Sequence, residues 1–340
     1  MLTATERQGA VFKDEGRVKE LVRLMKDNGC NCFRVRLFVN PTGRGGVIQD
    51  VPYVIDLARR IKQSGSLFVL DLHYSDTWAD PGKQFKPKAW GNLHFNDLVS
   101  QIETYTADVI SQFKKENLLP DIVQIGNEID GGFLWPEAQL YLKDADREVQ
   151  LKKFAKLLKA AIRGLKKAIG PSSRVQIMIH ISSGGNKGRT EYFFKNIESQ
   201  KIPYDIIGLS YYPWWHGTID DLKANFEHTA NLFNKDILLA ETAFPYHEMS
   251  FGRAPFQGPF FCPVSIEGQK EFLDQVIETV QSTPNNHGLG VLWWYPESVP
   301  IENQWIWNGG ATALFDKNGN ALPSMRSFAV NKAKGNLNKD

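Results

Sequence analysis

The amino-acid sequence predicts an α/β protein built as a (β/α)8 barrel, and two patterns carry this prediction. Strand-like and helix-like segments alternate along the 340 residues. Short apolar runs bounded by Gly or Pro are typical of buried parallel strands, and amphipathic segments between them are typical of covering helices. No linker rich in Ser, Gly or Pro divides the chain, so we expect residues 1–340 to form one domain.

The predicted helices follow from the spacing of apolar residues. The first is expected from Val18 to Met25, where apolar residues recur every three or four positions, and Gly29 ends it. Pro52 begins the second helix and Gly65 ends it. Further helices are expected over residues 94–117, 147–169, 192–199, 219–234 and 267–281, and a last one after Pro323.

Seven strands are predicted, which is one fewer than the barrel requires. Their starts lie near Cys32, Leu67, Ile122, Val175, Ile206, Ile237 and Gly290. The absent strand should precede the first helix, yet residues 1–16 contain no apolar β-forming run. We therefore expect a barrel whose first strand is missing or truncated, either because Met1 is a truncated start or because another segment closes the barrel. A sheet left open there would expose a hydrophobic edge.

Composition excludes several classes of function. The net charge of +2 is spread along the chain, so no basic stripe indicates nucleic acid or an anionic membrane as partner. No apolar stretch is long enough to span a bilayer, and residues 1–17 do not resemble a signal peptide. The three cysteines do not indicate a disulfide framework, and no ligand spacing indicates a metal or another cofactor.

Two glutamates are the strongest candidates for chemistry. Glu128 in IVQIGNEID and Glu241 in ILLAETAFPY each stand where an apolar strand ends, so in one barrel both would face the same mouth. Hydrolysis of a glycosidic bond requires one carboxylic acid and one carboxylate, and Asn127 beside Glu128 is expected to hold the sugar 2-hydroxyl. The alternative is that each glutamate only forms a salt bridge or a cap near solvent.

Several segments resemble the endo-β-1,4-galactanases of glycoside hydrolase family 53. The most specific is DLHYSDTWADPGKQ from Asp71, and the others are IGNEIDGGFLWP from Ile125, IIGLSYYPWW from Ile206 and PVSIEGQ from Pro263. They occur in the family's order over nearly the whole chain. The resemblance implies one (β/α)8 catalytic domain with its acid/base and its nucleophile on strands four and seven.

The resemblance also implies roles for individual residues. Glu128 would be the acid/base and Glu241 the nucleophile. A positive neighbour would keep Glu241 ionised, and we expect Arg36 to supply this charge, with Arg34 sharing the role or lying in the barrel floor. The alternative for both arginines is an internal salt bridge that only stabilises the fold. His180 would hydrogen-bond the sugar or Glu128, unless it is a core histidine.

The remaining candidates are expected to bind the sugar. His73, Asp76 and Trp78 would line a subsite. Alternation lets only one member of each aromatic pair at a strand end face the mouth, which leaves open the choice between Tyr211 and Tyr212, between Trp214 and Trp215, and between Trp293 and Trp294. We take Tyr211, Trp214 and Trp294 as the binding candidates.

The sequence also departs from the family pattern at two places. Ser182 and Ser183 stand where many relatives carry Asp-Asn, which puts one sugar contact in doubt. Tyr295-Pro296-Glu297 replaces the usual continuation Glu-Pro after Trp294. The run YHEMSFGRAPFQGPFF after Glu241 lacks the acidic cluster with which some bacterial members bind calcium, so no calcium is expected there.

The function implied is retaining endo-hydrolysis of β-1,4-galactosidic bonds in galactan or type I arabinogalactan of plant cell walls. We expect a monomer that is secreted or periplasmic. The alternatives are another β-glycanase of the same clan, such as a mannanase or a glucanase, and a carbohydrate-binding barrel without catalysis. The sequence leaves open the number of subsites and the tolerance for arabinose branches.

Overall fold

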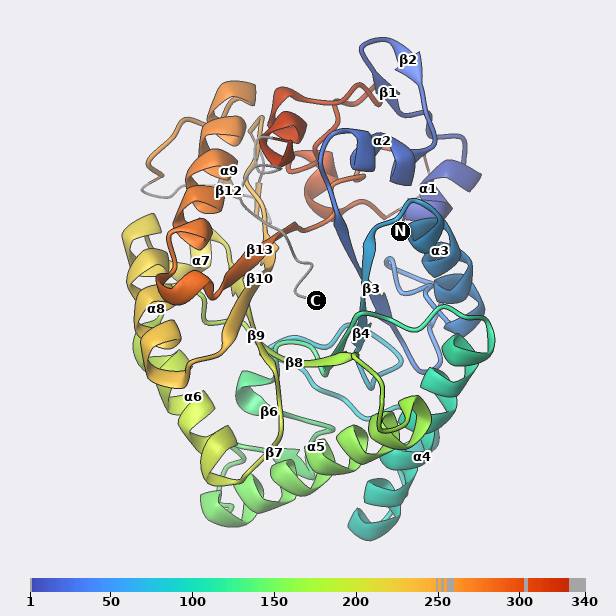
Figure 1. The fold of residues 1–340 in the computed structure, drawn as a ribbon, viewed down its shortest axis with the longest axis vertical. Coiled ribbons are helices and arrows are strands. Elements are labelled where there is room, and N and C mark those ends of the chain that lie inside the picture. The colour runs from blue at the N-terminus through green and yellow to red at the C-terminus, as the bar shows by residue number, and fades with distance from the viewer. Residues whose placement is uncertain (1, 249, 252–253, 256–259, 303–304, 330–340) are drawn as a thin grey trace.

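The computed structural model describes residues 2–248, 250–251, 254–255, 260–302 and 305–329. Its central sheet has seven parallel strands in the order β13-β10-β9-β8-β5-β4-β3, which curve into a barrel (Figure 1). These strands are β3 (Cys32–Leu37), β4 (Leu67–Leu72), β5 (Ile122–Ile125), β8 (Gln176–Ile181), β9 (Ile206–Tyr211), β10 (Asp236–Thr242) and β13 (Gly288–Trp293). All seven predicted strands are confirmed, and the barrel formed by the described residues is one strand short of eight.

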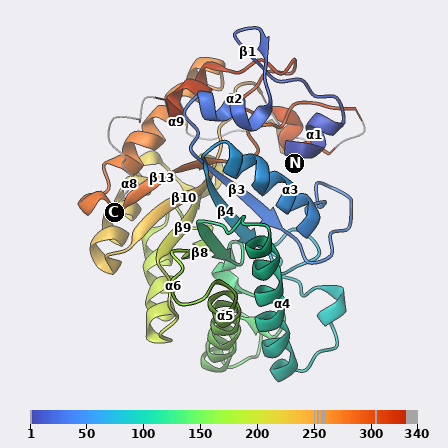
Figure 2. The same ribbon diagram turned by 45° about the vertical axis from the view of Figure 1, so that its right-hand side comes forward.

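Helices cover the outside of the barrel (Figures 1 and 2). The α-helices are α1 (Leu2–Arg7), α2 (Leu21–Asp27), α3 (Val51–Gln63), α4 (Phe95–Lys115), α5 (Arg147–Ile169), α6 (Lys187–Ser199), α7 (Pro213–His216), α8 (Ile219–Phe233) and α9 (Ile266–Gln281). The 3₁₀ helices are η1 (Lys88–Trp90), η2 (Ile129–Gly131), η3 (Pro284–Asn286), η4 (Trp307–Gly310) and η5 (Pro323–Phe328).

Three small two-stranded sheets lie in the connections between these elements. They pair β1 (Lys13–Asp14) with β2 (Arg17–Val18), β6 (Gly132–Phe133) with β7 (Ala138–Gln139), and β11 (Ser250–Phe251) with β12 (Ala254–Pro255). Each pairing is antiparallel.

Three helix predictions are wrong in detail. The helix expected over residues 192–199 begins at Lys187, because the Asn186 side chain accepts a hydrogen bond from the backbone N–H of Arg189. The first long helix begins at Leu21 because the Glu20 side chain accepts hydrogen bonds from the backbone N–H groups of Val22 and Arg23, while Val18 lies exposed in the β1/β2 hairpin. The segment after Pro323 forms the 3₁₀ helix η5 instead of an α-helix.

The buried core has two layers, as expected for a barrel. The larger layer lies between the strands and the helices. The smaller layer fills the interior of the barrel and consists of Val69, Ile122, Met178, Ile206, Leu238, Ala240 and Leu292. Because these seven apolar side chains fill one level of the interior, the polar side chains of the same strands gather nearer the strand ends.

The barrel wall is not closed between β3 and β13. These strands are the two ends of the sheet order, and no backbone ladder joins them in the described part of the chain. They nevertheless approach each other within 8 Å between Cα atoms. α1 and the β1/β2 hairpin occupy the chain before α2, where the first strand of a complete barrel is expected.

No helix within the described residues is both long enough and apolar enough to cross a membrane.

Candidate active site

The backbone after β5 turns sharply, and this turn positions Glu128. Gly126 has φ +79°, and a Cβ atom there would meet Ile129 Cγ2 at 2.7 Å. Glu128 itself is left-handed, with φ 47° and ψ 55°, which is rare for a residue with a side chain. Such backbone strain is found most often at functional sites.

Glu241 reaches the barrel interior because β10 is irregular at its end. Ala240 belongs to the interior apolar cluster, so strict alternation would turn Glu241 outward toward the helices. The register with β9 shifts between Leu239 and Glu241, and this irregularity directs Glu241 inward as well. An oxygen of Glu241 and an oxygen of Glu128 lie within 4.8 Å of each other.

Arg34 on β3 holds the centre of the site. Its Nη1 donates to Glu241 Oε1 at 2.9 Å, and its Nη2 donates to Asp71 Oδ2 at 2.9 Å and to Asn127 Oδ1 at 2.7 Å. Its Nε donates to Gln124 Oε1 at 2.7 Å. The guanidinium group therefore ties the nucleophile candidate to the C-terminal ends of β4 and β5.

The prediction that Arg36 supplies the charge beside Glu241 is wrong. Arg36 is buried among the rings of Trp78, Trp294 and Tyr295, with its guanidinium carbon 4.4 Å, 5.0 Å and 4.5 Å from their respective centroids. Its Nη2 also donates to the Tyr295 hydroxyl. Arg34 supplies the positive charge beside Glu241 instead. It lies two residues before Arg36 on β3, deeper in the barrel and at the level of Glu241.

Tyr212, and not Tyr211, contacts Glu241. The Tyr212 hydroxyl donates to Glu241 Oε2 at 2.9 Å, whereas the Tyr211 hydroxyl donates to the backbone oxygen of Gly217 and its ring is fully buried. Tyr211 still belongs to β9 and points outward, and Tyr212 is the first residue beyond the strand. Both carboxylate oxygens of Glu241 thus accept a hydrogen bond.

Glu128 receives a hydrogen bond from Ser210, a residue that the sequence did not single out. Ser210 Oγ donates to Glu128 Oε1 at 2.7 Å, and His180 Nε2 lies 3.0 Å from the same Oγ. His180 Nδ1 lies 2.9 Å from Asn127 Oδ1. Gln124 Nε2 lies 3.2 Å from the same Nδ1, and Asn127 Nδ2 donates to the backbone oxygen of Ala79. His180 therefore reaches Glu128 only through Ser210.

The two glutamates have different electrostatic surroundings. Burial raises the pKa of Glu128 well above its ordinary value, and the charge of Glu241 raises it further. Burial also raises the pKa of Glu241, but the positive charge of Arg34 and the hydrogen bond from Tyr212 oppose that rise. Glu128 is consequently the group that keeps its proton, and Glu241 is the group that ionises.

The family model of glycosyl hydrolase family 53 matches residues 1–328. The chain belongs to glycosyl hydrolase family 53. It is therefore a glycoside hydrolase, with the barrel fold of that family.

Three similar proteins each match most of the chain. A Niallia circulans protein described as an uncharacterized protein in the bgaB 5′ region is 36% identical over 95% of this chain and 90% of its own length. The endo-beta-1,4-galactanase of Bacillus subtilis (strain 168) is 30% identical, covering 96% of this chain and 82% of its own. The solved family 53 catalytic domain of Ignisphaera aggregans superposes with a TM-score of 0.85 at 32% identity, covering 96% of this chain and 92% of that chain.

In this family 53 chain, a cleft of about 850 Å³ opens over the two glutamates. Its aromatic lining consists of Trp78, Tyr212, Trp215, Trp294, Tyr295, Trp305 and Trp307. Of the predicted binding residues, Trp78, Trp294 and Asn127 line the cleft. Trp215, which is exposed, takes the place predicted for Trp214. Trp305 and Trp307 were not predicted, because they come from a long connection without periodic pattern.

Other predicted binding residues lie behind the cleft. His73 is buried, with Nε2 3.0 Å from Asp71 Oδ2 and Nδ1 accepting from the N–H of Ala79. Asp76 accepts from the backbone N–H groups of Asn40 and Lys88, so it shapes the loop. Neither residue is among the described residues that line the cleft, and we correct both predictions to positioning roles.

The two family departures are accommodated by local contacts. Ser182 lines the cleft, and its backbone N–H and its hydroxyl both donate to the carboxylate of Asp130. Ser183 also lines the cleft. The hydroxyl of Tyr295 accepts the hydrogen bond from Arg36 described above.

One set of side chains in the described part of the chain has the spacing to hold a metal ion: Glu128, His180 and Glu241. Both nitrogens of His180 lie at hydrogen-bond distance from protein neighbours, and Arg34 already provides a positive charge at Glu241. A role in proton transfer explains why these three side chains lie together, so a metal ion is not needed to explain it. Part of the run YHEMSFGRAPFQGPFF, where no calcium was predicted, lies outside the described residues.

Proposed function

We propose that this chain hydrolyses internal β-1,4-galactosidic bonds of galactan with retention of anomeric configuration. Glu128 acts as acid/base and Glu241 as nucleophile. The separation of the two carboxyl groups carries the proposal, because their oxygens lie within 4.8 Å. Retaining enzymes place these groups about 5 to 5.5 Å apart, whereas inverting enzymes leave about 6.5 to 9.5 Å for a water molecule.

The surroundings of each carboxyl group support its role. In the first step, protonated Glu128 donates its proton to the glycosidic oxygen while ionised Glu241 attacks the anomeric carbon, which gives a covalent glycosyl-enzyme. In the second step, Glu128 takes a proton from water, and this water releases the sugar from Glu241. Arg34 and Tyr212 hold Glu241 ionised and oriented for the attack.

Asn127 and the aromatic rings of the cleft bind the sugar. One N–H of the Asn127 amide donates to Ala79 O, and the amide has a second N–H, which we propose binds the 2-hydroxyl. Trp294 forms the floor under the sugar that is cleaved. The exposed Trp215 and Trp305 offer flat apolar faces farther along the cleft.

The choice of galactan rests on the names of the relatives. The Bacillus subtilis relative is named an endo-beta-1,4-galactanase, and an Aspergillus niger relative is named an arabinogalactan endo-beta-1,4-galactanase A. An extracellular polymer as substrate requires export, so we propose a secreted or periplasmic location. Activity measured in medium, periplasm and cytoplasm of the source cells tests this location.

A panel of polysaccharides tests the substrate. We expect the purified protein to release short oligosaccharides from β-1,4-galactan, with an early fall in viscosity that marks internal cleavage. Mannan and cellulose should remain intact. Cleavage of mannan or glucan alone would favour the other clan-related glycanases, and the absence of any cleavage would favour a binding barrel.

Replacement of the nucleophile tests the mechanism. Glu241→Ala should abolish activity while the circular dichroism spectrum stays unchanged. Azide should then restore turnover and give a glycosyl azide of inverted configuration, because azide enters the space that the carboxylate left. An active Glu241→Ala protein would exclude Glu241 as nucleophile.

A further inference from the structure

Two side chains that hydrogen-bond the two glutamates come from one short piece of backbone. Ser210 Oγ donates to Glu128 Oε1 at 2.7 Å, and the Tyr212 hydroxyl donates to Glu241 Oε2 at 2.9 Å. Only Tyr211 separates these two donors in the chain. The conformation of this piece of backbone therefore affects both carboxyl groups.

The backbone of Ser210 and the backbone of Tyr212 are held in different ways. Ser210 belongs to β9 and pairs with Glu241 of β10 in the parallel ladder. Tyr212 lies one residue beyond the strand. Because its backbone N–H and C=O groups are outside the ladder and buried, they need other hydrogen-bond partners.

His216 provides a partner for both backbone groups of Tyr212. The N–H of Tyr212 donates to His216 Nδ1 at 3.0 Å. The carbonyl oxygen of Tyr212 accepts from the backbone N–H groups of Trp215 and His216, each at 2.9 Å. The rings of Tyr212 and His216 also pack together, with 5.9 Å between their centroids. His216 therefore contacts Tyr212 through its ring and through its backbone.

The imidazole ring of His216 is neutral in these surroundings. Burial lowers its pKa to about 4, a hydrogen bond to the backbone of Ser210 opposes this shift, and the positive charge of Arg189 adds to it. Nδ1 faces a backbone N–H, which can only donate, so the neutral ring carries its proton on Nε2. Nδ1 is thus free to accept the hydrogen bond from Tyr212.

His216 is itself fixed by the loop between β8 and α6. A Cβ atom on Gly185 would lie 1.6 Å from the backbone oxygen of His216, so glycine is required for this close approach. The N–H of the neighbouring Gly184 donates to the backbone oxygen of Ser210 at 2.9 Å. The same loop therefore supports the end of β9 and the position of His216.

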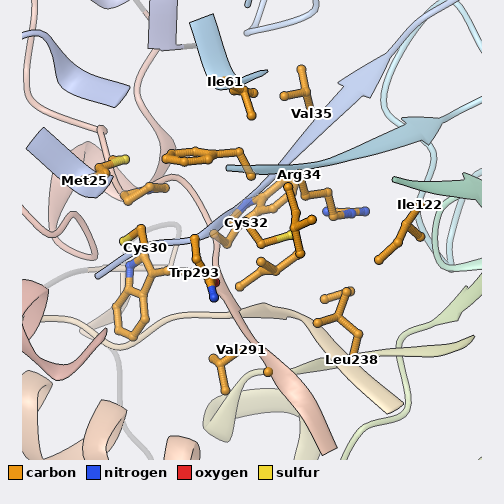
Figure 3. Close-up of a pocket in the computed structure, with 18 of the residues that line it drawn as sticks. Met25, Cys30, Cys32, Arg34, Val35, Ile61, Ile122, Leu238, Val291 and Trp293 are labelled. Atoms are coloured by element: carbon orange, nitrogen blue, oxygen red, sulfur yellow. The ribbon is translucent and has the colours of Figure 1, made fainter. Parts of the chain in front are cut away.

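The other donor to Glu241 approaches from the opposite side. Arg34 Nη1 donates to Glu241 Oε1 at 2.9 Å from β3, and Arg34 also lines a cavity of about 280 Å³ beside β3 and β13 (Figure 3). Tyr212 is not among the described residues that line this cavity, and its ring packs 5.2 Å from that of Trp214. The orientation of Glu241 therefore depends on how firmly Tyr212 is held.

We propose that His216 is a positioning residue for the nucleophile, because it holds the backbone of Tyr212 so that the hydroxyl stays on Glu241 Oε2. This role of His216 rests on the function proposed above, in which Glu241 attacks the sugar. His216 lines the cleft, but its ring hydrogen-bonds protein backbone. It acts on the reaction through Tyr212 alone.

Three substitutions of His216 test the proposal. His216→Ala removes the acceptor for the N–H of Tyr212, and we expect kcat on β-1,4-galactan to fall about tenfold. His216→Asn places an amide oxygen near the position of Nδ1 and should restore most of this loss. His216→Gln carries its amide farther out, near the position of Nε2, and should not. His228→Ala, which removes a histidine of α8 that contacts Glu191, is the matched control and should keep full kcat.

The pH profile separates this role from a general loosening of the site. Without His216 the hydrogen bond from Tyr212 weakens, so the pKa of Glu241 rises and the acidic limb should move to higher pH. The alkaline limb should stay, because Ser210 keeps its place in the ladder and its contact with Gly184. In the double variant His216→Ala/Tyr212→Phe, the acidic limb should move no farther than in Tyr212→Phe, since both changes remove the same contact.

A titration without substrate separates this proposal from the proposed function. NMR of the glutamate carboxyl carbons should show a higher pKa for Glu241 in His216→Ala and His216→Gln, and an almost unchanged pKa in His216→Asn. If His216→Ala does not fold, His216→Gln tests the same loss with a side chain of similar size. A protein that leaves galactan intact and still shows these pKa changes would overturn the function and not the role of His216.

Three results would overturn the role of His216. The first is an unchanged pKa of Glu241 in His216→Ala and His216→Gln while Tyr212→Phe raises it. The second is a double variant whose loss of kcat equals the product of the two single losses, since His216 would then act independently of Tyr212. The third is an acidic limb that moves to lower pH in His216→Ala, which would mean that protonation of His216 itself limits the activity.

Discussion

Arg34 and Glu241 are separated by 207 positions in the chain, yet their side chains meet at 2.9 Å between Nη1 and Oε1, and each is only 5% exposed. A buried ion pair loses much of its hydration, so its presence calls for a reason beyond stability. The same guanidinium group binds Asp71 and Asn127, and this fork fixes the position of Glu241 relative to Glu128. The pair therefore keeps Glu241, the proposed nucleophile, ionised and in place.

Arg34→Lys tests this pair. Lysine keeps the charge but lacks the planar guanidinium group that contacts four partners at once, so we expect kcat to fall by roughly 100-fold. The acidic limb of the pH profile should move to higher pH, because Arg34 lowers the pKa of Glu241 and a poorer partner lowers it less. Arg36→Lys is the matched control and should leave the acidic limb where it is. An equal displacement in both variants would contradict the assignment to Arg34.

Tyr212→Phe removes the hydrogen bond to Glu241 Oε2 and keeps the ring. We expect kcat to fall about 10- to 100-fold and the acidic limb to move upward, because this hydrogen bond lowers the pKa of Glu241. Tyr211→Phe loses only a hydrogen bond to the backbone oxygen of Gly217, so it should affect Tm and not kcat. Steady-state kinetics across pH for both variants checks the pair of outcomes.

Ser210→Ala tests Glu128 as the proposed acid/base. The hydrogen bond from Ser210 stabilises the ionised form of Glu128 and so lowers its pKa. Without it the pKa of Glu128 rises further, and because catalysis needs Glu128 protonated in the first step, the alkaline limb should move to higher pH. A displacement of the alkaline limb to lower pH would argue that His180 and Ser210 act on Glu128 in another way.

Gly126→Ala tests the strained turn before Glu128. The new methyl group would be forced into Ile129 at a φ of +79°. Gly65→Ala, just after α3, is a control for the backbone strain alone, since Gly65 has φ +71° with nothing within 4 Å of its Cβ position. An alanine held at such a positive φ costs about 1 to 2 kcal/mol, so thermal unfolding should show a larger loss for Gly126→Ala, together with a loss of kcat that Gly65→Ala lacks. Equal losses of stability and of kcat in the two variants would show that the turn before Glu128 has no special role in catalysis.

The barrel could be predicted because its signals are local. Each strand is a short apolar run and each helix has a periodic face, so all seven strands and the order of Glu128 and Glu241 follow from sequence spacing. The interior contacts could not be predicted in this way. Arg34 and Arg36 point to the same side of β3, and which of them reaches Glu241 depends on the depth at which β10 ends.

The choice within Tyr211 and Tyr212 failed for a related reason. Alternation decides which residue of a strand faces inward only while the strand is regular, and Tyr212 lies one residue beyond β9. Trp305 and Trp307 reach the cleft through tertiary folding of a connection that has no pattern of its own. The extent of the catalytic domain over residues 1–340 and the monomeric state stay predictions.

The stereochemistry of the first product tests the central claim most directly. Proton NMR during hydrolysis of β-1,4-galactan should show the β-anomer of the new reducing end first, with the α-anomer appearing later by mutarotation. Two displacements at one carbon, first by Glu241 and then by water, require this order. The initial appearance of the α-anomer would contradict the account, because water would then attack the anomeric carbon directly.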